Sequence, residues 1–180
     1  LYEELIARAT GAGLHQYEIA NFARNDARTA LRNPEAGTSS IPSRACRHNV
    51  NYWRGGSFYG LGPSATGYVR GVRTKNWANT QLYCEQLEKG KRAVESAEEL
   101  KPLARAGETA AFGLRMNAGW GFDEFQRVTG QDLRQDWQSD MTRLVERGWG
   151  LLVPDGFQLT RQGLRFADAA AEMFLRWTSI

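Results

Sequence analysis

The sequence predicts an α+β fold in which a short helix-to-strand unit precedes a helical, winged-helix-like C-terminal domain. Near the start of the chain a helix pattern, a glycine loop and a β-rich stretch follow one another, as in one α-to-β step of an α/β sheet. Over the last part of the chain three helix patterns precede a hairpin and a final helix, which is the element order of a winged helix.

The composition is that of a folded protein with a mild basic excess. With 180 residues, 42% of them hydrophobic and 24% charged, the chain is long enough for one substantial core or two small ones. Its net charge is +3 and its pI is about 9.0, and most of the positive excess lies between residues 21 and 56. Anionic partners are therefore weakly favoured near that stretch.

The chain shows neither a signal peptide nor an apolar run long enough to span a bilayer, so we expect a cytoplasmic protein without a membrane anchor. It begins with Leu1 inside a helix pattern, which indicates a piece of a longer protein. Cys46 and Cys84 lack the CxxC or CxxxCxxC spacing, so this chain alone is not expected to hold a structural zinc or an iron–sulfur cluster.

In the first half, the opening helix is expected to end at Gly11 to Gly13 and to lead into one strand that contains Tyr17, Ile19 and Phe22. Residues 24–45 are poor in large apolar groups and contain a Gly-Thr-Ser-Ser cluster, which predicts a flexible surface insertion. A strand over 58–61 is expected to run into a Gly-Pro-Ser loop.

The second half is more regular. The helices are predicted over 77–92, 97–114, 122–128 and 132–147, with Ser96 to Glu99 as a capping box and Gly130 as a stop. A hairpin pairs residues 151–153 with 157–159, and Thr160 caps the last helix.

A winged-helix order raises the question of DNA binding. The third helix of that order would be the recognition helix, yet it carries four acidic residues, Asp132, Asp136, Asp140 and Glu146, against three arginines. A protein surface that binds a phosphate backbone is basic where it contacts the phosphates, so no nucleic-acid partner is expected.

Three blocks of sequence carry a family resemblance: YEIANFA at 17–23, CRHNVNYW at 46–53 and GLGPSA at 60–65. Together they resemble the C-terminal half of the radical-SAM oxygen-independent coproporphyrinogen III oxidases and their heme-chaperone relatives, the HemN/HemW type. The resemblance spans nearly the whole chain. It implies that residues 1–23 end a partial, TIM-like α/β barrel, that 24–95 form a connecting segment with the insertion 24–45, and that 96–180 form the winged-helix-like domain.

The resemblance also implies a function in tetrapyrrole and heme metabolism. The full-length parent would hold a [4Fe–4S] cluster on an N-terminal CxxxCxxC and cleave S-adenosylmethionine; since this chain lacks those cysteines, it is expected to be inactive by itself. The strand YEIANFA and the motif HNxxYW favour the chaperone branch, which binds heme and delivers it to acceptor proteins. A true coproporphyrinogen III oxidase, which carries out an oxidative decarboxylation, and a purely structural capping domain remain as alternatives.

On that resemblance, His48 is the leading axial ligand of heme iron. A neutral imidazole nitrogen binds such iron, and the neighbouring Tyr52 and Trp53 can offer flat faces to a porphyrin. Arg47, or Arg44 before it, can neutralise a propionate. Asn49 either orients the ring or ties the local turn, and Asn51 has the same two readings.

Plainer readings stay open for each of these residues. His48 would otherwise be an ordinary buried or capping histidine, and the two aromatic residues after it would belong to the core. Cys46 is either a small buried hydrophobe or a thiolate ligand in place of His48. The sequence departs from the family at two places: the stretch from 24 to 45 is longer, and Thr66 stands where relatives often have a histidine.

Overall fold

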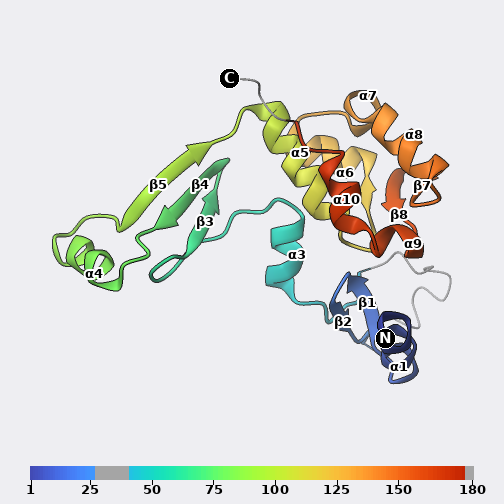
Figure 1. The fold of residues 1–180 in the computed structure, drawn as a ribbon, viewed down its shortest axis with the longest axis horizontal. Helices are drawn as coiled ribbons and strands as arrows, with labels where there is room; N and C mark the ends of the chain where they lie inside the picture. The colour runs from blue at the N-terminus through green and yellow to red at the C-terminus, as the bar shows by residue number, and fades with distance from the viewer. Residues whose placement is uncertain (27–40, 177–180) are drawn as a thin grey trace.

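A computed structural model describes residues 1–26 and 41–176, and Figure 1 shows how their elements are arranged. The described residues form a mixed α/β structure with three small antiparallel sheets and no closed barrel. Most of the predicted insertion 24–45 lies outside the described residues, so its predicted flexibility is not addressed by the structure. Within the described ranges, no helix is both long and apolar enough to cross a bilayer.

The N-terminal unit is a helix packed on a hairpin. Helix α1 (Tyr2–Gly11) leads into β1 (His15–Glu18) and β2 (Asn21–Ala23), which pair antiparallel. The single strand predicted over this stretch is therefore wrong. The chain turns back because the buried carboxylate of Glu18 accepts hydrogen bonds from the Ala20 N–H at 3.0 Å and from Asn21 Nδ2 at 2.7 Å, which closes a tight turn.

The middle of the chain forms a sheet that extends away from the helical domain (Figure 1). Its strands are β3 (Thr66–Val69), β4 (Val72–Asn76) and β5 (Val94–Glu99), with β4 in the centre. Helix α4 (Thr80–Glu88) connects β4 to β5 and is capped by Asn79, whose side chain accepts from the Leu82 N–H at 3.0 Å. The strand predicted over 58–61 is reduced to an isolated bridge between Phe58 and Tyr68.

The predicted capping box at 96–99 is also wrong, because those residues belong to strand β5. Opposite charges pair across the sheet: Arg73 lies 3.4 Å from Glu98 and Lys75 lies 3.8 Å from Glu95. Such cross-strand pairs favour the extended conformation for a segment that also fits a cap pattern. The following helix begins instead at Pro102, whose ring suits the first turn of a helix.

The C-terminal domain is helical with a three-stranded sheet, in the order β6-β8-β7. The predicted hairpin, the glycine stop at Gly130 (φ +78°) and the cap by Thr160 are all confirmed. Its elements are α5 (Pro102–Gly113), β6 (Trp120–Gly121), α6 (Phe122–Thr129), α7 (Leu133–Asp136), α8 (Gln138–Glu146), β7 (Gly150–Val153), β8 (Gly156–Leu159), α9 (Arg161–Leu164) and α10 (Ala167–Glu172).

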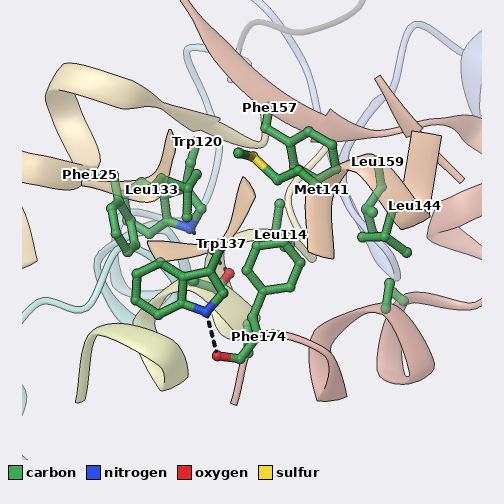
Figure 2. Packing of buried hydrophobic residues seen from close by; sticks show 14 of the residues in the cluster. Leu114, Trp120, Phe125, Leu133, Trp137, Met141, Leu144, Phe157, Leu159 and Phe174 are labelled. Carbon is green, nitrogen blue, oxygen red and sulfur yellow. Dashed lines mark hydrogen bonds between the residues drawn. The ribbon is translucent and has the colours of Figure 1, made fainter. Parts of the chain in front are cut away.

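The main hydrophobic core lies in this domain and is rich in aromatic rings (Figure 2). Trp137 is fully buried, and its Nε1 donates to the Phe174 carbonyl at 2.8 Å. The helix predicted over 132–147 breaks at this residue into α7 and α8, and the last helix breaks likewise at Phe166, whose ring stacks on Trp149 at 4.6 Å. Both breaks occur beside an aromatic ring that packs against another part of the domain, so packing overrides helical continuity here.

Candidate functional site

The motif at 43–56 folds as a short helix between the N-terminal hairpin and the C-terminal domain (Figure 1). Helix α3 (Arg47–Trp53) begins after Cys46, whose backbone is extended, and ends at Arg54. Residues four positions apart lie on the same side of a helix. His48 and Tyr52 therefore share one side, and Asn49 and Trp53 share a neighbouring side.

The first side of α3 presents an accessible imidazole. His48 is exposed, and its ring meets Phe58 edge-on at 6.5 Å between centroids. Tyr52 lies against the same Phe58 at 5.1 Å. In the described part of the chain, no hydrogen bond involves either ring nitrogen of His48, and the helix cap is Cys46. His48 is thus neither buried nor a capping residue, and its nitrogens are open to a ligand.

The second side of α3 faces a small core. Trp53 is half-buried and packs against a cluster of Tyr17, Ala23 and Met116. The guanidinium of Arg115 lies 5.2 Å from the centre of its ring. The Trp53 Nε1 is buried without a hydrogen-bond partner among the described residues. The two aromatic residues of the motif still touch: the Trp53 ring meets the Tyr52 ring edge-on at 4.9 Å and lies 5.9 Å from Phe112. Trp53 therefore joins the small core to the aromatic rings around Tyr52.

The two asparagines hold the backbone around α3. Asn49 Nδ2 donates to Asn21 Oδ1 at 3.3 Å, which joins the helix to β2. Asn51 Nδ2 donates to the Ser57 carbonyl at 3.0 Å, and a Cβ on Gly56 would collide with the Asn51 amide. Asn51 thus ties the local turn, whereas Asn49 ties α3 to a distant strand. A role of either residue in orienting a ring stays a prediction.

The arginines around α3 have different surroundings. Arg44 forms an ion pair with Asp26 at 2.5 Å. Arg54 is largely buried: it donates to the Gly119 carbonyl at 2.6 Å, and its Nη1 lies 3.6 Å from Glu124. Burial lowers the pKa of the Arg54 guanidinium and Glu124 partly offsets that shift. Arg47 is exposed and has no ion pair within the described ranges, so it is the motif's arginine that remains available to an anion.

Cys46 and Cys84 are both exposed free thiols, so the prediction of Cys46 as a small buried hydrophobe is wrong. The Cys46 N–H donates to the Tyr17 hydroxyl at 3.3 Å. Residues 1–26 and 41–176 contain no group of three or more histidine, cysteine or acidic residues placed to hold a metal ion.

Sequence reasoning missed a cavity of about 470 Å³ beside α3. It lies between α3, the middle sheet and α5, and three of its aromatic residues lie outside the motif: Phe58, Tyr68 and Phe112. The signal in the sequence was the alternation of aromatic and small residues over 58–68, but only the pairing of Phe58 with Tyr68 shows that both rings reach the same cavity.

Comparisons with known proteins place the chain among related sequences. A family model described as the HemN C-terminal domain matches residues 100–166. The heme chaperone HemW of Bacillus subtilis (strain 168) is 27% identical over 175 residues, which are 97% of this chain and 42% of the relative. The heme chaperone HemW of Mycobacterium tuberculosis (strain ATCC 25618 / H37Rv) is 31% identical over 169 residues, 90% of this chain and 38% of the relative.

The fold has a solved counterpart. The structure of coproporphyrinogen III oxidase (HemN) from Escherichia coli, described as a radical SAM enzyme, superposes with a TM-score of 0.64 over 96% of this chain and 39% of that chain, at 16% identity. The chain therefore spans about two fifths of the length of the proteins it matches. Residues 100–166 belong to the HemN C-terminal domain family, and the chain as a whole is similar to the C-terminal two fifths of heme chaperones HemW, with a fold shared with HemN.

Proposed function

We propose that this chain is the C-terminal portion of a heme chaperone, which binds heme at helix α3 for delivery to acceptor proteins. The observation that carries the proposal is the exposed imidazole of His48, whose nitrogens meet no protein partner among the described residues. The names of the sequence relatives support it, since proteins called heme chaperones match 90% to 97% of this chain.

The residues around His48 fit an iron porphyrin. Heme supplies an iron that accepts an imidazole nitrogen as axial ligand. His48 would provide that nitrogen, and Tyr52 would lie against the macrocycle beside it. Arg47, exposed and without an acidic partner in the described part of the chain, would pair with a propionate. Asn49 and Trp53 would contribute by holding α3 in place from its core side.

The domain boundaries follow from the same proposal. Residues 1–23, with α1 and the β1–β2 hairpin, would complete the partial barrel of the full-length protein, and 24–95 would connect it to a winged-helix-like domain over 96–180. The [4Fe–4S] cluster and S-adenosylmethionine would belong to the full-length protein only, which we place in the cytoplasm. Heme or a porphyrin would be the ligand, and no nucleic-acid partner is proposed.

An oxygen-independent coproporphyrinogen III oxidase is the second candidate, and the fold shared with HemN favours it. The sequence relatives named as chaperones are 27% and 31% identical, against 16% for the oxidase, which is why the chaperone is preferred. The two functions differ in the ligand. A chaperone should bind heme more tightly than the iron-free ring and should lose that preference in His48→Ala, whereas an oxidase should prefer the iron-free coproporphyrin skeleton and bind heme without dependence on His48.

The test is a heme titration of the chain and of His48→Ala, followed through the Soret absorption. Loss of the axial ligand should weaken binding by about tenfold or more, which is about 1.4 kcal/mol, and should abolish the Soret shift. His15→Ala is the matched control because His15 is the other histidine of the sequence and is also exposed. A Soret shift that is unchanged in His48→Ala would remove this residue from the proposed role.

A further inference from the structure

The cavity beside α3 is walled by a chain of aromatic rings. The ring of Tyr52 lies 5.1 Å from that of Phe58 and 5.6 Å from that of Phe112, and Phe58 lies 6.3 Å from Tyr68. These rings come from α3, the segment after it, β3 and α5, and they line a volume of about 470 Å³. A flat aromatic molecule is the kind of ligand that such a wall accommodates by ring contact.

The charged residues of this cavity are Arg73, Arg105 and Glu108. Arg73 forms ion pairs with Glu108 and, at 3.4 Å, with Glu98. Within the described ranges Arg105 forms no ion pair, although it is partly buried. The lining therefore carries one guanidinium whose charge is not neutralised by a protein carboxylate.

The guanidinium of Arg105 lies close to the turn between β3 and β4. Gly71 is buried with φ +89°, and a Cβ at this position would collide with Arg105 Nη1. The absence of a side chain at Gly71 thus leaves the space in which the guanidinium rests. A cation held in this way beside aromatic walls suits a carboxylate, because a guanidinium can donate two parallel hydrogen bonds to it.

We propose that this aromatic cavity binds the carboxylate-bearing edge of a porphyrin, with Arg105 pairing with a propionate and Tyr52 contacting the macrocycle. The inference rests on the proposed function, because Tyr52 and Phe58 line the cavity and Phe58 also contacts the ring of His48. It adds a specificity determinant for the acidic groups of the ligand that is separate from the iron ligand His48.

The experiment uses iron-free protoporphyrin IX and its dimethyl ester, with binding followed by porphyrin fluorescence. Arg105→Gln should weaken binding of the dicarboxylate by about tenfold and should leave binding of the ester within about twofold. Arg105→Lys should retain part of the affinity because it keeps the charge and loses only the paired donors. Arg70→Gln is the matched control. Arg70 is an exposed arginine in the turn between β3 and β4, carries the same charge as Arg105 and does not line the cavity.

The outcomes separate this inference from the proposed function. Since iron is absent from the probe, His48→Ala should leave the affinity for protoporphyrin IX within about twofold while removing the Soret shift with heme. Equal losses in Arg105→Gln and Arg70→Gln, equal losses for the dicarboxylate and the ester, or no binding of protoporphyrin IX by the unmodified chain would each overturn the role of Arg105. A Soret shift independent of His48, together with the expected loss in Arg105→Gln, would instead count against the iron ligand.

Discussion

At the scale of single residues, one short motif serves two different surfaces. His48 and Tyr52 face Phe58, whereas Asn49 and Trp53 face the N-terminal hairpin and its small core. The family resemblance identified these four residues but not this division, because it depends on the helical geometry of α3 and on what packs against each side. The sequence therefore predicted which residues to consider and left a core role and a porphyrin-facing role open for Trp53. In the structure its ring packs on the small core and also meets Tyr52 at 4.9 Å.

Glu18 is the residue whose loss should be most disruptive near the site. It is only 2% exposed, accepts two hydrogen bonds within the turn after β1 and lies 3.4 Å from Arg115 Nε. In Glu18→Gln the buried one of the two carboxylates beside Arg115 loses its charge, while Asp168 remains, and the amide nitrogen of the new side chain cannot accept a hydrogen bond. The free energy of unfolding, measured with urea, should fall by about 1–3 kcal/mol.

Glu4→Gln is the control for this prediction. Glu4 pairs with Arg8 at 2.6 Å on the exposed face of α1, with side chains that are 60% and 80% exposed. Exposed pairs of this kind contribute little, so the change should cost less than about 0.5 kcal/mol. Equal losses in the two variants would show that the Glu18 carboxylate does not hold the hairpin.

At the scale of elements, local sequence patterns predicted a helix end or a hairpin correctly where contacts with distant parts of the chain did not favour another structure. The stop at Gly130 and the 151–159 hairpin are local features and are confirmed. The pattern at 96–99 fits a helix cap equally well, but β4 supplies a strand partner that the sequence does not reveal. The breaks at Trp137 and Phe166 were missed for the same reason, since they depend on contacts with distant rings.

Thr160 offers a direct test of one such local signal. Its Oγ1 accepts from the Gly163 N–H at 3.0 Å and donates to the Gly148 carbonyl at 2.8 Å, so it caps α9 and ties it to a residue just before the β7–β8 hairpin. Thr160→Ala removes both hydrogen bonds. It should lower the free energy of unfolding by about 1–2 kcal/mol in urea denaturation.

The same replacement within a helix should behave differently. Thr142 lies inside α8 and is exposed, and its hydroxyl donates only to the Gln138 carbonyl one turn earlier, at 2.9 Å. Alanine is the better helix former, and this bond does not cap a helix end. Thr142→Ala should therefore leave the free energy of unfolding unchanged or raise it by roughly a few tenths of a kcal/mol. A loss in Thr142→Ala as large as that in Thr160→Ala would contradict the capping explanation.

At the scale of the whole molecule, α3 is anchored to the C-terminal domain by Arg54. Its guanidinium lies 4.6 Å from the centre of the Trp120 ring and donates to the Gly119 carbonyl, 65 positions further along the chain. Arg115, just after the end of α5, makes the corresponding connection toward Glu18 and Trp53. No pattern in the sequence predicts these connections, because each joins residues that are close only in the folded chain.

These connections matter for the proposed function because they hold α3, which carries the exposed His48, in place. The helix is held by the hairpin through Asn49 and by the C-terminal domain through Arg54, so His48 and Tyr52 project from a supported element. The resemblance predicted the composition of the site and its branch of the family. The cavity with Arg105 required the structure, because its walls come from four separate segments of the chain.

The role of His48 as axial ligand is tested most directly by magnetic resonance on the bound iron. In the His15→Ala chain, prepared without a histidine tag and with ¹⁵N-labelled histidine, His48 carries the only labelled imidazole, since the sequence has 2 histidines. With ferric heme bound, electron–nuclear double resonance should show a ¹⁵N coupling to the iron. Bound heme without a ¹⁵N coupling would contradict the assignment of His48.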